Sequence, residues 1–152
     1  MTMAMPLHRS PPRAAQAGAA VLEFAVLMAV LVTFMLLVAE YGRLMMQYQT
    51  LVKSARAAAR YASTQPPGTN TLQAQCLAVT GSLAVSGTAC ATTTPLLTGL
   101  GTSNVALSTG TLDATTATVK VRVSGLVYVP AFTTLGLSIT FEPIDAVMPQ
   151  PK

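Results

Sequence analysis

The chain has 152 residues, of which 51% are hydrophobic and 9% are charged, and its formal net charge is +4 at pH 7. This length favours one domain, and so apolar and charge-poor a composition excludes a disordered chain. The cations do not cluster with aromatic residues, so the composition indicates no nucleic-acid partner. We interpret them as membrane-flanking charges and a solvated helix face.

Residues 1–18 are predicted to form an unstructured leader. They contain three prolines, two arginines and no acidic residue. The only histidine of the chain, His8, also lies here. Consequently, no histidine-containing metal set and no histidine-dependent catalytic triad can be written for the rest of the chain.

A long apolar segment over residues 19–40 follows the leader. From Phe24 to Ala39 it contains no charge and one hydroxyl, that of Thr33. Its length matches the ~20 residues of a transmembrane helix, and its Leu, Met, Ala and Phe content favours a helix over a strand. A secretory signal peptide is the rival interpretation, but its apolar core is usually shorter, and residues 37–40 match a cleavage site poorly.

The helix is predicted to continue beyond the membrane as an amphipathic segment over residues 41–64. Apolar residues recur there at intervals of three and four, which places them on one face. This apolar seam consists of Tyr41, Leu44, Tyr48, Leu51, Ala55, Ala58 and Ala62. The opposite face carries Arg43, Gln47, Thr50, Ser54 and Arg60. Gly42 weakens the helix locally, and the QPPG sequence at residues 65–68 ends it.

Residues 65–152 are predicted to form a small α+β domain. A short helix capped by Asn70 or Thr71 is expected through Val79. Its apolar face would consist of Leu72, Cys76 and Leu77. Alternating apolar residues then predict three strands. Their apolar members are Val105 and Leu107; Val119, Val121, Val123, Val127 and Val129, with Gly125 as a bulge; and Leu137, Ile139 and Phe141, before Pro143. These strands would form an antiparallel sheet whose apolar face covers the helix seam.

The two cysteines, Cys76 and Cys90, lie in this C-terminal region. A bridge between them would enclose about 15 residues and could add ~3 kcal/mol of stability in an oxidising compartment. Two buried free thiols are the alternative. We expect the disulfide, because a small sheet domain needs additional stabilisation.

The most informative feature is an acidic residue, Glu23, at the start of the otherwise uncharged span. An acidic side chain in a membrane helix is costly and calls for a partner, although the cost is lower near the end of the span. Cleavage after Gly18 would create an α-amino group on Ala19, four residues from Glu23 on the same helix face. The pair could form within one chain or between neighbours, where it would set their register. Alternatively, Glu23 is an interfacial residue near the lipid head groups.

The combination of a basic leader, Gly18, Glu23 at the fifth position after it, Phe24 and an apolar run resembles the processing site of type IV prepilins. More narrowly, residues 18–63 resemble the TadE-like family of minor pilins or pseudopilins of the tight-adherence (Flp) pilus system. The matching features are GAAVLEFAVL, the long apolar run and EYGRLMMQYQTLVKSARAAARYAS.

This resemblance implies that a prepilin peptidase cuts after Gly18 and that the mature chain begins at Ala19. It implies a single-pass protein of the bacterial inner membrane, with a cytoplasmic N-terminus and residues 65–152 in the periplasm. Other pilins and the tight-adherence secretion platform would be its partners in a fibre used for adhesion and biofilm formation. Phe24 stands where major Flp pilins tend to have tyrosine, and the chain is much longer than a major pilin. This greater length favours a minor component over the bulk subunit of the fibre.

The distribution of cations opposes this orientation. Two arginines precede the span, whereas four cations follow it within about 20 residues. These four are Arg43, Lys53, Arg56 and Arg60. We still expect an exported C-terminal region, because a folded domain after a span can be translocated largely regardless of its charge. The peptidase site and the cysteine pair also suit export.

An enzyme and a signal-anchored periplasmic binding module are the two alternatives to a pilin. An enzyme would need an acid–base pair of defined geometry, but Glu142 and Asp145 are separated by Pro143, and no other spacing suggests such a pair. We therefore expect no catalytic residue, no metal and no cofactor. A signal-anchored periplasmic binding module outside any fibre would share the span but would need no cut after Gly18.

Overall fold

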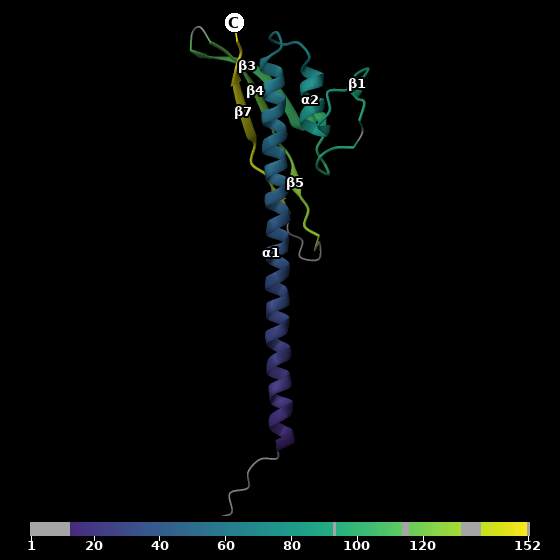
Figure 1. Cartoon of the computed structure of the whole chain (residues 1–152), viewed down its shortest axis with the longest axis vertical. Coiled ribbons are helices and arrows are strands. Elements are labelled where there is room, and N and C mark those ends of the chain that lie inside the picture. Colours follow the sequence, from purple (N-terminus) through teal and green to yellow (C-terminus); the bar gives the residue numbers. More distant parts are fainter. Residues whose placement is uncertain (1–12, 93, 114–115, 132–137, 152) are drawn as a thin grey trace, which may run out of the picture. The chain divides into compact units, whose positions relative to one another are not determined.

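The computed structural model describes residues 13–92, 94–113, 116–131 and 138–151. It contains a long apolar helix, a short helix and a small antiparallel sheet, which confirms the predicted α+β fold class (Figure 1). The chain divides into two compact units, Met1–Tyr41 and Gly42–Lys152, so the division falls inside the long helix.

Helix α1 runs from Arg13 to Ser63. Alanine, leucine and methionine favour it, and no proline interrupts it. The prediction of an unstructured leader is wrong for residues 13–18, because the helix begins at Arg13. The sequence RAAQA at residues 13–17 consists of good helix formers, and the prolines of the leader all precede it. Residues 1–12 lie outside the described residues.

Within the Gly42–Lys152 unit, one face of α1 is buried in the core of the domain. The predicted apolar seam is confirmed at Leu51, Ala55, Ala58 and Ala62. Alanines on this face let the neighbouring elements approach the helix backbone closely. The seam is wrong at Tyr41, which is 62% exposed. Leu44 is partly buried against the core, and Tyr48 is 43% exposed although its ring contacts that of Phe141.

Ser54 was predicted on the polar face of α1, but its side chain is buried. Its hydroxyl donates a hydrogen bond of 3.0 Å to the carbonyl of Leu51, which satisfies the buried polar group. The sequence pattern missed this position because a serine that bonds to its own helix can replace an alanine on a buried face.

Helix α2 spans Thr71–Thr80. Asn70 holds the N-cap position with a left-handed φ of 53°, but its side chain does not cap the helix. Its amide donates instead to Oε1 of Gln65 at 2.9 Å. The predicted face is wrong except at Cys76, since the buried residues are Ala74, Cys76, Ala78 and Val79. The small side chains face the core, and the leucines of this helix lie at its margin, half-buried.

The main sheet has the strand order β3–β4–β7, and both pairs are antiparallel. Its strands are β3 (Val105–Asp113), β4 (Thr116–Val123) and β7 (Ile144–Pro149). Val121 of the central strand lies opposite Leu107 of β3 and Ala146 of β7. The predicted inward face of β4 is confirmed, since Val119, Val121 and Val123 are buried.

The predicted continuation of this strand past Gly125 is wrong. Gly125 adopts a positive φ of 74°. After this residue the buried positions change parity, so Leu126 and Tyr128 are buried whereas Val127 and Val129 are 45% and 65% exposed. Strand β5 (Val127–Tyr128) then pairs with β6 (Ile139–Thr140) in a separate two-stranded sheet.

The third strand of the main sheet was also predicted in the wrong place. It is β7, which begins after Pro143, and not the Leu137–Ile139–Phe141 run. Leu137 lies outside the described residues, and Ile139 is 49% exposed. Phe141 is buried, and its ring centroid lies 6.1 Å from that of Tyr48 and 6.5 Å from that of Tyr128. The aromatic residue therefore packs in the core without belonging to the main sheet.

A short hairpin and a single helical turn complete the domain. The hairpin pairs β1 (Val85–Ser86) with β2 (Ala89–Cys90), and Gly87 in its turn has a φ of 61°. The 3-10 turn η1 (Thr102–Asn104) leads directly into β3.

Candidate processing and assembly site

The predicted processing residues all lie on α1. Gly18, Ala19, Glu23 and Phe24 are exposed, and a Cβ added at Gly18 would meet no atom within 4 Å. Ala19 and Glu23 are four positions apart in this helix, so they share a face. The side chain of Glu23 is therefore about one helical turn from Ala19, the residue whose amide nitrogen cleavage would convert to an amine.

The carboxylate of Glu23 is isolated in this part of the helix. Among the described residues, no cation lies within ion-pair distance of it. Its nearest neighbours along the helix are apolar, including Leu22 and Phe24, which are 70% and 60% exposed. An acid at this end of a span either finds a counter-charge or lies among the lipid head groups.

The helix surface that follows this acid is apolar on every side. All residues from Gly18 to Ala39 are exposed, and they include leucine, valine, methionine and phenylalanine. The hydroxyl of Thr33 donates to the carbonyl of Ala29 at 2.8 Å, so this polar group is satisfied within the helix, as a lipid environment requires. Among the described residues, one helix is long and apolar enough to cross a membrane, and its candidate segment is Gly18–Ser63. This helix is consistent with a single-pass membrane anchor.

The family model described as TadE-like protein matches residues 18–60. The match begins at the proposed cleavage position and ends within the buried part of α1, so it covers the span and the amphipathic continuation. It confirms the resemblance to the TadE-like family over this segment. Neither the curated proteins nor the solved structures contain a match to the chain.

The two cysteines are joined in the structure. The Sγ atoms of Cys76 and Cys90 lie 2.04 Å apart, and their Cα atoms are 5.4 Å apart. The bridge connects the buried face of α2 to strand β2. It therefore ties the hairpin to the core, whereas β1 and β2 pair only with each other among the described strands. Formation of this bridge in the cell remains a prediction.

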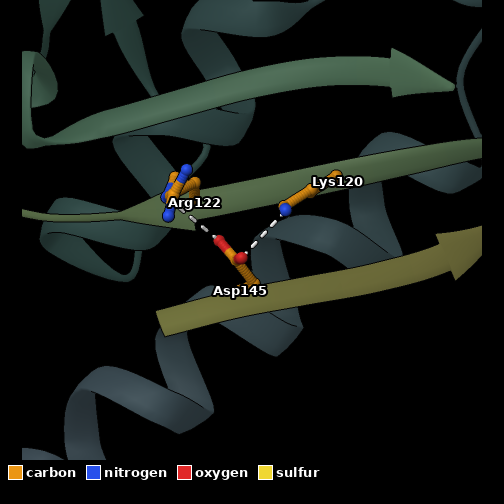
Figure 2. A network of polar contacts seen from close by, with 3 residues as sticks. All are labelled: Lys120, Arg122 and Asp145. Carbon is orange, nitrogen blue, oxygen red and sulfur yellow. Dashed lines mark ion pairs between the residues drawn. The ribbon is translucent and has the colours of Figure 1, made fainter. Parts of the chain in front are cut away.

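A charged cluster on the sheet was missed by the sequence analysis. Figure 2 shows Asp145 of β7 between Lys120 and Arg122 of β4. The Nζ of Lys120 lies 2.8 Å from Oδ2 of Asp145, and the Nε of Arg122 lies 3.4 Å from its Oδ1. The hydrogen bond from Lys120 and the charge of Arg122 lower the pKa of Asp145 below its ordinary value. The sequence placed both cations on the polar face of β4, but it could not place the acid, because β7 was not predicted.

This cluster has the character of a cross-strand ion pair and not of a catalytic site. Its side chains are between 34% and 51% exposed, and a surface ion pair contributes little stability. Among the described residues, no group of three or more His, Cys, Asp or Glu side chains could hold a metal ion.

Proposed function

We propose that the chain is a minor pilin or pseudopilin of a tight-adherence (Flp) pilus and that a prepilin peptidase trims it after Gly18. The observation that carries the proposal is the exposed apolar stretch from Gly18 to Ala39, in which the single acid, Glu23, lies four residues after Ala19. The match of residues 18–60 to the TadE-like family supports the same assignment.

The proposed trimming changes the charge at the N-terminal end of the transmembrane segment. Hydrolysis of the Gly18–Ala19 peptide bond would leave a carboxylate on Gly18 and an amine on Ala19. A free α-amino group has a reference pKa of ~7.7–8.0, so the amine would be mostly protonated at neutral pH. It would then offer the isolated Glu23 a counter-charge.

The charge pair would be most useful between neighbouring subunits. Four helical residues correspond to a rise of about 6 Å, so the amine of one chain reaches the Glu23 of another only at a defined axial stagger. A neighbour in any other register would leave an acid unpaired in an apolar environment, which is unfavourable. In this proposal, trimming therefore controls both the time and the geometry of assembly.

The proposed topology places residues 1–18 in the cytoplasm, residues 19–40 in the inner membrane and residues 65–152 in the periplasm. The cations Lys53, Arg56 and Arg60 oppose this orientation by number, but they are exposed residues of the folded Gly42–Lys152 unit. Charges of a folded domain contribute little to orientation. The Cys76–Cys90 bridge supports an oxidising compartment for this domain.

The role of Glu23 can be tested in cells that assemble the native pilus. Glu23→Gln keeps the shape of the side chain and removes its charge, so trimming and insertion should persist whereas co-purification with partner pilins, adhesion and biofilm formation should be lost. Glu142→Gln is the matched control, because it removes an exposed carboxylate of the domain. Normal pili in the Glu23 variant would refute the proposed charge pairing.

The cleavage position is tested separately. Gly18→Val adds a branched side chain directly before the proposed cut, where the helix itself has room for it. The variant should therefore fold and insert but accumulate untrimmed. Trimming at the normal position in this variant would count against Gly18. A periplasmic binding module outside the fibre, the second candidate, would remain untrimmed even in the unmodified protein.

A further inference from the structure

The two outer strands of the main sheet differ in what they offer at their free edges. Strands β3 and β7 flank β4, and each has one edge without a strand partner among the described residues (Figure 1). A free edge presents unpaired backbone N–H and C=O groups, which is a template for another strand unless the edge is covered or blunted.

Hydrogen bonds at the start of β3 define which residues face its free edge. The carbonyl of Asn104 accepts a bond of 2.9 Å from the N–H of Ser124, so Asn104 faces the β4 side. The next carbonyl, that of Val105, faces away and accepts a bond of 2.9 Å from the side chain of Gln75 in α2. Helix α2 therefore covers the free edge at its first residue.

Further along β3 the free edge is uncovered. The direction of backbone groups alternates from residue to residue in an antiparallel strand. Leu107, Thr109 and Thr111 consequently turn their N–H and C=O groups toward the free edge, and no hydrogen bond to these groups is found among the described residues. This stretch contains no proline and no charged side chain that would discourage a further strand.

The free edge of β7 is blunted. The N–H of Gln150 donates to the carbonyl of Ala117 at 2.8 Å, so the alternation turns Asp145, Val147 and Pro149 outward. Proline has no N–H to donate, and it is typical of strands that should not be extended. The contrast between the two edges indicates that β3, and not β7, is available to a partner.

A groove of about 390 Å³ lies beside the uncovered part of β3. It is lined by Leu107, Ser108 and Thr109 of β3, by Val119 of β4 and by residues of the connection between α1 and α2. Among the residues that the structure describes, no charged side chain lines it. Gln150 also borders the groove, and its buried Oε1 has no hydrogen-bond partner among the described residues.

We propose that the β3 edge from Leu107 to Thr111 binds an extended, uncharged segment of a partner polypeptide, which adds to the sheet as a fourth strand. In such a complex the backbone groups supply affinity, and pockets for alternate side chains supply specificity. The groove would take small apolar or hydroxyl side chains of the partner, because Leu107, Val119 and threonines line it.

A second copy of this chain fits the edge poorly. Its β7 edge is blunted, and antiparallel pairing of two β3 strands would relate the copies by a two-fold axis normal to the sheet. Because α1 packs along a face of the sheet between Gly42 and Ser63, the two helices would then run in opposite directions. Under the proposed function the subunits of one fibre share the same direction, and such a two-fold pair does not fit this.

Site-specific photo-crosslinking of the full-length chain in its native membrane tests the proposal. p-Benzoylphenylalanine in place of Thr111 reports on the β3 edge, and the same probe in place of Val147 reports on the β7 edge. The expected result is an adduct from position 111 only, joined to an uncharged stretch of another polypeptide. Intact mass of the same samples shows whether the chain is trimmed, so a failure here is distinguishable from a failure of the pilin assignment.

Two substitutions at an exposed residue make the adduct diagnostic. Thr109→Lys introduces a charge at the uncovered edge and should abolish the adduct, whereas Thr109→Val keeps a strand-forming side chain and should preserve it. Neither change disturbs the core, because Thr109 is exposed. The proposal would be overturned if position 111 gave no adduct or gave an adduct to a second copy of the chain. It would also be overturned if position 147 gave an equal adduct, or if the adduct at position 111 persisted in the Thr109→Lys variant.

Discussion

Helix α1 carries apolar side chains in two different ways along its length. From Gly18 to Ala39 every residue is exposed, and the apolar side chains are large and surround the helix. From Leu51 to Ala62 the buried apolar residues form one face, and most of them are alanines. A helix that is apolar all round needs a surrounding apolar medium, whereas a one-sided apolar face needs only a partner within the protein.

The contrast shows how one continuous helix can serve two environments. Large side chains fill an irregular surface of lipid or neighbouring helices, and they demand no particular partner. Small side chains let a sheet approach the helix backbone, so they depend on the shape of that sheet. We therefore expect substitutions in the two stretches to affect different properties of the molecule.

Leu51→Ala should have the largest effect on the folding of the domain. Leu51 is 1% exposed in the core, and truncation of a buried leucine costs about 2–5 kcal/mol. The measurement is denaturant unfolding of the full chain in detergent micelles, followed by near-UV circular dichroism. Leu31→Ala is the matched control from the exposed stretch, and it should leave this transition unchanged. Equal losses in both variants would contradict the distinction between the two stretches.

Removal of the disulfide should have the next largest effect. The bridge closes a loop with a sequence separation of 14 residues, and a loop of this length corresponds to roughly 3 kcal/mol in the chain-entropy model. Replacement of both Cys76 and Cys90 by alanine should lower the stability of the domain by about that amount. Non-reducing mass analysis of the unmodified protein should show the two residues joined, and free thiols in exported material would rule the bridge out.

Gly42→Ala should raise the stability of α1 where the two stretches meet. A Cβ at this position meets no atom within 4 Å, so the methyl group is accommodated. Alanine is favoured over glycine inside a helix by about 1 kcal/mol. Hydrogen exchange of the backbone amides around residue 42 should therefore slow in the variant. Faster exchange, or reduced helix content, would show that the glycine is required by the fold.

The smallest effect concerns the ion pair on the sheet. Because the pKa of Asp145 is lowered from its ordinary value of 3.8, the carboxylate contributes stability above that value and loses it as the pH falls through the lowered pKa. Asp145→Asn should flatten the loss of stability below about pH 4. The measurement is the free energy of unfolding as a function of pH, with Glu142→Gln as the control. If the Asp145 variant lost as much stability in acid as the unmodified protein, the ion pair would not contribute to this pH dependence.

The parts of the fold that were predicted correctly have strong local periodicity. The long helix and the inward face of β4 follow directly from repeats of three to four and of two residues. The errors occur where a single residue changes the geometry. Gly125 reverses the parity of the residues after it, and Ser54 is buried because its hydroxyl bonds to its own helix. Neither effect can be read from a hydrophobic pattern.

The candidate processing site could be derived from the sequence because its residues are close together on one helix. The spacing of Ala19 and Glu23 alone places them on one face. The edge of β3 and the ion pair at Asp145 could not be derived in this way. Both depend on the position of β7, whose short run with a central Ala146 carries a weak strand pattern.

The identity of the mature N-terminus is the most direct test of the central claim. Intact mass and N-terminal sequencing should be carried out on the protein purified from cells that contain their own prepilin peptidase. Our account predicts a chain that begins at Ala19, with the amine beside Glu23. A protein that still carries residues 1–18 while it is assembled with its partners would contradict the account.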